Sequence, residues 1–222
     1  MSINKPYQSP DELPDVLPVF PLAGVLLLPR VSLPLTVFEA RYLDMFDDAL
    51  KSHRLIGIIQ PEAGENEHKT HPDLYSVGCV GRITQFAETG DGRYLVALTG
   101  VARFKVMEEL NSLTSYRQCH VSYDDYRVDF VPSAGEQDVN RNDILRTLRN
   151  FAKANDLKID WKSIEKTPNE PLVNELAMMS PFGPKEKQAL LEAKDLKLRA
   201  ETLVAIAEIE LARGQPSART LQ

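Results

Sequence analysis

The stretch LPVFPLAGVLLLPRVSLPLTVFEARY, from Leu17 to Tyr42, decides the fold of this chain. It holds four prolines among Val, Leu and Phe residues, and a fifth, Pro14, lies just upstream. Because proline fixes φ and removes a backbone donor, the stretch cannot form a helix or a long central strand. Its apolar residues still require burial. We therefore predict short strands and tight corners wrapped into a barrel-like β core.

The residues around this stretch extend the β pattern to about residue 123. A helix is expected from Ala40 to Ser52, where apolar residues recur at helical spacing. Tyr94 to Leu98 is continuously apolar, which predicts a strand buried on both faces. The remaining strands are expected at Val16–Phe20, Val25–Leu28, Leu33–Phe38, Leu55–Ile59, within Tyr75–Val106 around a turn at Thr89–Gly92, and near Tyr116–Tyr123.

After Pro132–Gly135 the β pattern gives way to helical spacing. One helix is expected around Ile144–Ala152, and Thr167–Glu170 has the form of a capping box that opens a second. Ser180–Pro184 ends that helix, and a last helical stretch reaches about Arg213. The predicted fold class is therefore α+β, with flexible tails at 1–14 and 214–222, a β domain at 15–131 and a helical bundle at 136–213.

Composition and charge indicate a globular protein whose first part would repel a phosphate backbone unless basic residues cluster locally. Of the 222 residues, 43% are hydrophobic, and no run approaches the ~18 apolar residues that span a bilayer. Since the N-terminus also lacks an apolar signal region, we expect a cytoplasmic protein and no membrane partner. Residues 1–135 hold 12 basic and 18 acidic residues and so carry the whole net charge of −6. Such a surface disfavours nucleic acid.

The motifs that carry common chemistries are missing from the sequence. It has no P-loop, no dinucleotide fingerprint, no H-E-x-x-H and no G-x-S-x-G. The pairs Asp47–Asp48 and Asp124–Asp125 are adjacent in sequence, so their side chains diverge. Cys79 and Cys119 are interpreted as buried thiols, and the loop 62–73, with His68 and His71, as a solvated connector. We expect no catalytic residue, no cofactor and no metal.

Two arginines stand among apolar residues. A guanidinium near a core requires a carboxylate or backbone carbonyls, so Arg41 and Arg103 are each expected to have such a partner. For Arg41 the candidates are Glu39 and Asp44.

Several ordered motifs make the chain similar to the Lon N-terminal domain family. The family pattern of LP-x-FPL, LPL-x-x-FE and an Arg-Tyr pair is matched at 17–22, 33–39 and 41–42. The similarity continues in Val77–Ile83, Asp91–Arg93, Gly100–Phe104, Leu172–Ala177 and Glu186–Glu192. It covers roughly residues 15 to 212.

The resemblance implies a PUA-like β pseudobarrel followed by a C-terminal helical bundle. In full-length Lon proteases this region precedes an ATPase module and a Ser–Lys peptidase, helps to recognise substrates and supports hexamer assembly. We expect this chain to lack both modules, and hence to be a non-catalytic form. A homo-oligomer is compatible with the resemblance.

The leading hypothesis is a module that binds unfolded or degron-bearing segments, or a protein partner, as an adaptor or regulator in proteolysis or protein quality control. Exposed apolar residues of the β domain would carry the binding. Two alternatives stay open: nucleic-acid binding through a PUA-like domain, and an uncharacterised enzyme with a site between the β domain and the helices. The candidate partner-binding residues are Phe20, Pro21, Leu33, Pro34, Phe38 and Arg41.

Overall fold

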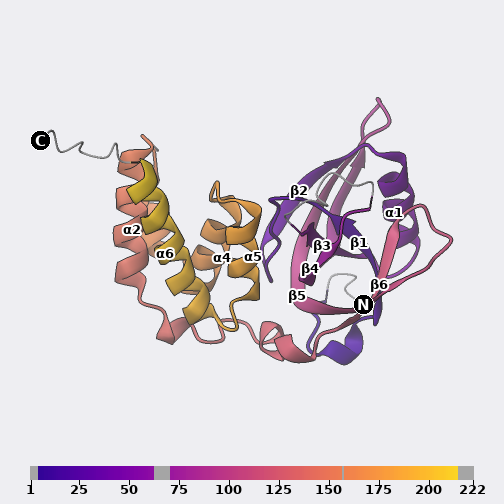
Figure 1. Cartoon of the computed structure of the whole chain (residues 1–222), viewed down its shortest axis with the longest axis horizontal. Coiled ribbons are helices and arrows are strands. Elements are labelled where there is room, and N and C mark those ends of the chain that lie inside the picture. The colour runs from indigo at the N-terminus through magenta and orange to yellow at the C-terminus, as the bar shows by residue number, and fades with distance from the viewer. Residues whose placement is uncertain (1–4, 63–70, 157, 215–222) are drawn as a thin grey trace, which may run out of the picture.

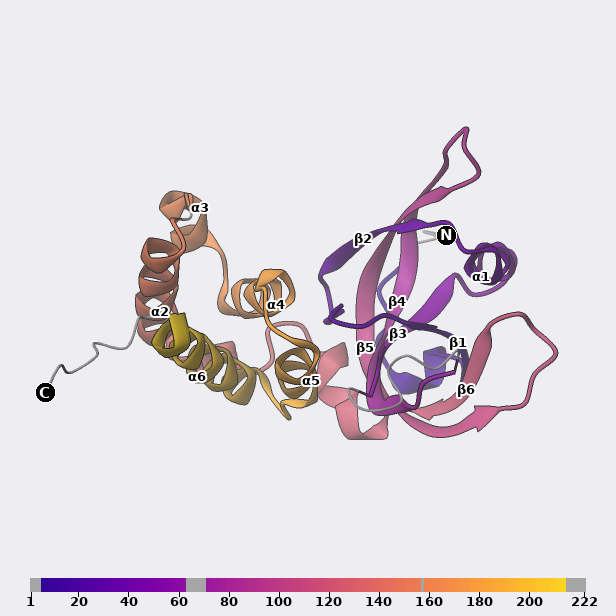
Figure 2. The same ribbon diagram turned by 45° about the horizontal axis from the view of Figure 1, so that its top comes forward.

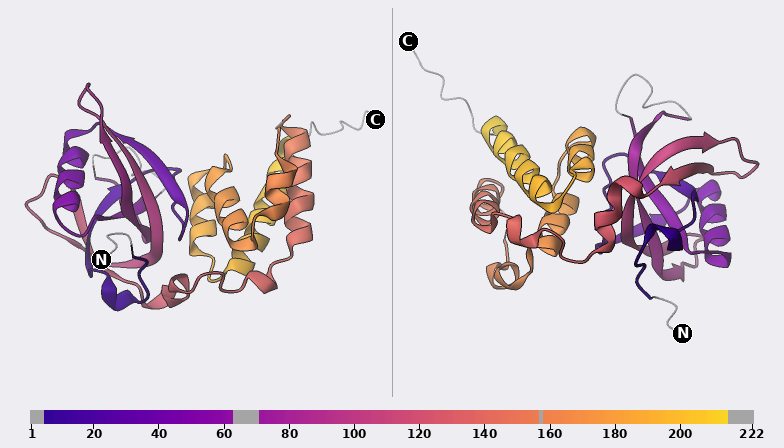
Figure 3. Two further views of the ribbon diagram at one scale, coloured as in Figure 1. Left: turned by 180° about the vertical axis from the view of Figure 1, so that it is seen from behind. Right: turned by 90° about the horizontal axis from the view of Figure 1, so that it is seen from below.

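The computed structural model describes residues 5–62, 71–156 and 158–214. In these residues six strands, with one α-helix between the second and third, are followed by five α-helices, and short 3₁₀ segments precede and follow the strands. The helical part lies beside the β domain, on the side away from α1 (Ala40–Lys51) (Figures 1 and 3). The predicted α+β class, a β-sheet followed by helices, is confirmed.

Five strands of the sheet close into a ring. The pairs run from β5 (Tyr94–Leu110) through β4 (Leu74–Glu88), β3 (Leu55–Pro61), β1 (Val16–Pro21) and β6 (Arg117–Ser122) back to β5. β1 and β3 are parallel, and the other neighbours are antiparallel. A sixth strand, β2 (Ser32–Val37), pairs with the first half of β5. Since β6 takes the second half of the same β5 edge, β2 is the one strand at the end of the strand order.

The proline-rich stretch explains this arrangement. Pro18 and Pro21 lie in the short β1, and Pro34 lies in β2. Residues Val25–Leu28 do not form the predicted strand, although Leu26, Leu27 and Leu28 are buried. Left-handed backbone at Gly24 (φ +69°) and Arg30 (φ +65°) bends the chain at both ends of this segment. That prediction was wrong because the buried leucines fill the barrel as an irregular loop instead of pairing.

The helical part consists of α2 (Arg141–Ala154), α3 (Trp161–Lys166), α4 (Asn169–Met179), α5 (Pro184–Glu192) and α6 (Leu196–Gly214). α6 packs along α2 and also contacts α4 and α5 (Figure 3). Thr167 does not cap α4 as predicted, because its hydroxyl donates to the Ser163 carbonyl (3.0 Å) and closes α3. The last predicted helical stretch is broken at Ala193, where the chain turns from α5 into α6.

Only part of each predicted tail belongs to the residues that the structure describes. Residues 1–4 and 215–222 lie outside them, as do residues 63–70 of the predicted connector, which include His68. In the N-terminal segment, Pro10–Glu12 forms a 3₁₀ turn and Leu13 is buried. The Tyr123 hydroxyl donates to the Pro14 carbonyl (2.9 Å), so this segment lies against the β domain.

One hydrophobic core joins the two parts. Phe46 and Leu98 of the β domain belong to the same buried cluster as Leu190 and Leu203 of the helices. At the junction the buried Arg103 donates to both oxygens of Asp129 (2.8 and 2.9 Å) and to the carbonyls of Leu191 and Ala193. The predicted need of Arg103 for a carboxylate is therefore confirmed. Its partner lies on the 3₁₀ segment η2 (Asp124–Phe130), after β6.

Asp129→Ala should lower the free energy of unfolding by about 3–5 kcal/mol, because Arg103 would stay buried without its carboxylate. Urea unfolding followed by circular dichroism measures the effect. Asp124→Ala is the control on the same segment: its pair with Arg127 is exposed, so unfolding should not change. Equal effects of the two variants would contradict the role given to Asp129.

Gly100→Ala should destabilise the protein by about 3 kcal/mol, at the upper end of the range for overpacking. A Cβ at this position would lie 2.0 Å from the Leu28 carbonyl oxygen, and a backbone atom cannot rotate away. Thermal unfolding of Gly90→Ala supplies the comparison, because a Cβ there meets nothing within 4 Å. If both variants melted alike, the close approach of the loop to β5 would be refuted.

Candidate functional site

The candidate site is the outer face of β2, β5 and β4, the face turned away from the core. Its residues stand in cross-strand rows set by the register: Thr36–Leu95–Ala87, then Pro34–Ala97–Gln85, then Ser32–Thr99–Arg82. Side chains alternate along a strand, so Val96 and Leu98 point into the core while Leu95, Ala97 and Thr99 lie on the other side, where neighbours cover Ala97 to 7% exposure. We call these rows the outer face.

The first two rows of the outer face are mostly apolar and form a hollow. This hollow, of about 590 Å³, is lined by Pro34, Thr36, Gln85, Ala87, Leu95, Ala97 and the neighbouring Phe86. Leu95 is 48% exposed, and Phe38, which directly follows β2, is 66% exposed. We call this depression the apolar hollow. Clustered exposed apolar side chains of this kind mark interaction surfaces more often than single ones do.

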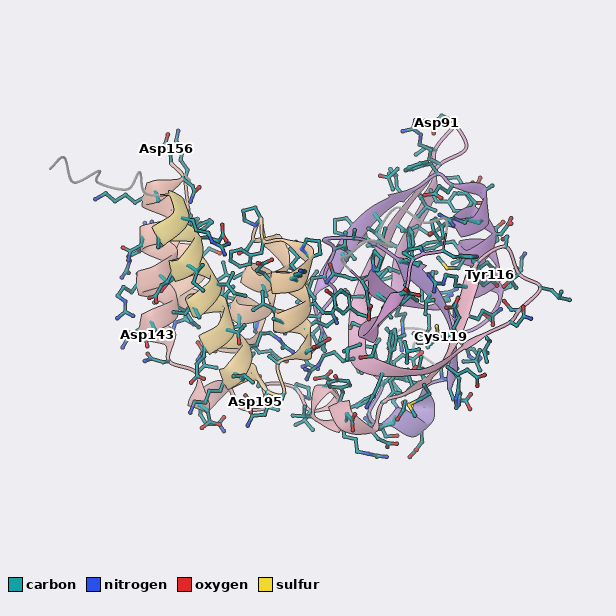
Figure 4. All side chains as sticks on the ribbon, in the orientation of Figure 1. Asp91, Tyr116, Cys119, Asp143, Asp156 and Asp195 are labelled. Carbon is teal, nitrogen blue, oxygen red and sulfur yellow. The ribbon has the colours of Figure 1, made fainter. Side chains whose placement is uncertain are left out.

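The hairpin that carries part of this face projects from the β domain. Figure 2 shows the ends of β4 and β5 extending beyond the other strands, and Asp91 lies at its tip (Figure 4). Phe86 and Tyr94 stack across it, with ring centroids 4.8 Å apart. The Tyr94 hydroxyl donates to Asp47 of α1 (2.9 Å), and this hydrogen bond raises the pKa of Tyr94. The base of the hairpin is thus held to α1.

The helices leave this part of the face open. The alternation reverses at Val101, because Gly81 pairs with Gly100 but Val80 pairs with Ala102. Arg103 therefore faces the same side as Leu98, where η2 and the end of α5 cover it. Leu95 lies on the opposite side of β5 and is 48% exposed.

The predicted partner-binding residues are spread over several surfaces. Pro34 and Phe38 are exposed, and Pro34 lies on the outer face. Leu33 is half-buried and points toward the core, between its neighbours Ser32 and Pro34. Phe20 is only 6% exposed, with its ring centroid 4.2 Å from that of Tyr42, so it belongs to the core.

Pro21 and Arg41 lie away from the outer face. Pro21 ends β1, which has no contact with β2 in the sheet order. Arg41 donates to Glu39 (3.0 Å) and stacks over Tyr42, with its guanidinium carbon 4.5 Å from the ring centroid. This is one of the two partners expected for Arg41, and the pair is partly exposed.

Sequence reasoning missed Leu95. The run from Tyr94 to Leu98 predicted a strand buried on both faces, and this was wrong for Leu95, which is 48% exposed because none of the described elements covers its side chain. An apolar binding face has the same local pattern as a doubly buried strand. The one available signal was the pairing partner, since a strand beside the proline-containing β2 lies near an edge.

Other groups in the described residues offer little chemistry. Cys79 and Cys119 are buried and free, as predicted, and burial raises the pKa of both thiols, to about 11 for Cys119. Neither is therefore a thiolate at neutral pH. Where the structure describes the chain, no three His, Cys, Asp or Glu residues are grouped to hold a metal ion. Within the same residues no helix has the length and apolar character to span a bilayer.

These features define the class: an α+β module that presents an open apolar sheet face and has no reactive centre among its described residues. The chain belongs to the family described as the ATP-dependent protease La (LON) substrate-binding domain, whose model matches residues 16–208. The resemblance to the Lon N-terminal domain family is thereby confirmed.

Curated relatives and solved structures agree with this assignment. Lon protease 2 of Sorangium cellulosum is 29% identical over 209 residues, which is 89% of this chain and 25% of that protein. The Lon protease of Anaeromyxobacter dehalogenans is 34% identical over 98 residues, or 44% of this chain and 12% of the relative. The chain thus spans a quarter or less of these relatives.

Two solved structures share the fold. The crystal structure of a Lon N-terminal domain protein from Xanthomonas campestris matches with a TM-score of 0.61 and 23% identity, over 86% of this chain and 97% of the other. The N-terminal domain of Mycobacterium avium complex Lon protease matches with a TM-score of 0.58 and 16% identity, over 87% of this chain and 98% of the other.

Leu95→Ser should change the free energy of unfolding by less than about 1 kcal/mol, since the side chain is half exposed and packs on no helix. Leu98→Ala, three residues along the same strand, should cost about 2–5 kcal/mol because Leu98 is fully buried. Denaturant titration of both variants checks this contrast. A large loss in Leu95→Ser would mean that the outer face is part of the core.

Proposed function

We propose that this chain is a non-catalytic module that binds unfolded or degron-bearing polypeptide segments on its outer face. The observation that carries the proposal is the apolar hollow, with Leu95 exposed on a rigid sheet in a domain of the substrate-binding family. An extended segment can place apolar side chains there without competing for the core, because the core residues point to the other side.

The same proposal includes a cellular location and a working partner for the module. It acts in the cytoplasm, as an adaptor or regulator beside a protease, and delivers the segments that it binds. The proposal includes no catalysis by this chain. Purified protein that cleaved casein in the presence of ATP would contradict that part.

The two alternatives gain no support from the residues described. The junction between the β domain and the helices is occupied by the side chains of Arg103, Asp129 and Gln188, which bond one another or nearby backbone. Such buried pairs are structural more often than catalytic. The acidic β domain repels phosphate, and a salt-dependent mobility shift of single-stranded RNA would be needed to favour nucleic acid.

Pro34→Ser/Leu95→Ser should bind a permanently unfolded probe about tenfold or more weakly than the unchanged protein. The probe is reduced, carbamidomethylated α-lactalbumin, and fluorescence anisotropy measures its affinity. Truncation of two anchor side chains typically costs at least about 1 kcal/mol each, and 1.4 kcal/mol corresponds to tenfold.

Met107→Ser/Met179→Ser is the matched control, because these residues are also exposed but line neither hollow. It should bind the probe like the unchanged protein. If the control lost as much affinity as the test variant, or if the unchanged protein bound no probe, the proposed function would be wrong.

A further inference from the structure

A second hollow, of about 260 Å³, continues the outer face past the apolar hollow. Thr84 and Thr99 line it from the sheet, and Tyr7, Arg30 and Arg82 line it from its sides. We call it the arginine hollow. The two hollows adjoin, because Thr84 precedes Gln85 on β4 and Thr99 follows Ala97 by one outward position on β5.

Most charges around the arginine hollow are already paired. Arg30 binds the Glu170 carboxylate and donates to the Asp129 carbonyl (2.5 Å). Asp129 also lines the hollow, but both of its carboxylate oxygens accept hydrogen bonds from Arg103. In the Arg30–Glu170 and Arg103–Asp129 pairs the positive and negative charges offset each other, so neither pair presents a net charge to a ligand in the hollow.

Arg82 is different. Its guanidinium stacks over the Tyr7 ring, 4.1 Å from the centroid, and one nitrogen donates to the Lys5 carbonyl (2.9 Å). Among the residues that the structure describes, no carboxylate lies within ion-pair distance of it. Its remaining donors are free while the ring fixes its plane, which is the arrangement that suits a carboxylate.

The position of Arg82 relative to the apolar hollow sets a spacing. Arg82 pairs with Thr99 across β4 and β5, and Thr99 lies four residues after Leu95. At ~3.3 Å per residue this is ~13 Å along the strand. An extended segment that follows β5 with an apolar side chain at Leu95 would therefore bring a residue four or five positions away to Arg82.

We propose that Arg82 binds a carboxylate of the same segment whose apolar side chains occupy the apolar hollow. This inference rests on the proposed function and narrows its substrate class. The preferred ligand is an extended polypeptide with an apolar pair and an Asp, a Glu or the terminal carboxylate four or five residues away. Charge complementarity supports this ligand: Arg82 is an unpaired cation on a domain that is otherwise acidic.

The test uses two peptides that differ in one group. Both are acetylated and amidated and carry a Leu-Phe pair, and the residue four positions away is Glu in one and Gln in the other. The unchanged protein should bind the Glu peptide about tenfold more tightly, as expected for one charge-assisted hydrogen bond. The preference should shrink at high salt.

Arg82→Gln should bind both peptides with the affinity that the unchanged protein has for the Gln peptide. Arg93→Gln is the control, since Arg93 is an exposed arginine of the same hairpin that pairs with Asp91, and it should keep the preference. The comparison of peptides on the unchanged protein does not depend on how any variant folds. A third peptide with the terminal carboxylate in place of Glu separates the two carboxylate sources.

The outcomes separate this inference from the proposed function. If the unchanged protein bound the Glu and Gln peptides equally and Leu95→Ser lost both, the role of Arg82 would be wrong and the apolar site would stand. If the unchanged protein bound neither peptide, the proposed function would itself fail. A preference for Glu that persisted in Arg82→Gln would place the carboxylate elsewhere.

Discussion

The buried guanidinium of Arg103 is the constraint on which the arrangement of the molecule depends. Its side chain is 1% exposed, and it reaches Asp129 on η2 and the carbonyls at the end of α5. It also stacks on Tyr126, 4.4 Å from the ring centroid. A buried guanidinium has lost its hydration, and this cost is offset only when its donors are hydrogen-bonded and its charge is paired. One residue of β5 therefore fixes both the η2 segment after the barrel and the end of α5.

Further polar contacts define the same junction. Gln60 of β3 donates to Gln188 and to the Pro184 carbonyl, and Gln188 donates to the Val77 carbonyl. Buried Arg199 donates to Asn174 (2.9 Å), and burial together with the charge of Arg103 lowers its pKa to about 10, so it stays charged at neutral pH. Apolar packing alone would allow the helices to slide over the barrel. Directional hydrogen bonds select one docking position.

The open face is a consequence of that docking position. The helices dock on the side of β5 that carries Leu98 and Arg103, so they leave Leu95 on the opposite side exposed, and an apolar surface there does not weaken the core. In the proposed function this surface binds apolar side chains of a segment, and Arg82 adds a polar contact at its end. The proposed site would select ligands by their pattern of side chains.

The sequence by itself determined the short strands around the prolines, the helix after Glu39, the change to helices after residue 135, the buried thiols and the need of Arg103 for a partner. These features follow from local properties of the chain: the fixed φ of proline, the spacing of apolar residues, and the need of a charged residue among apolar neighbours for a partner. Only the tertiary structure decided that Leu95 is open while Leu98 is buried, that Leu26–Leu28 is a loop, and that Arg82 stands beside Tyr7. Those facts depend on strand register and on which distant segment covers each face, and packing sets both.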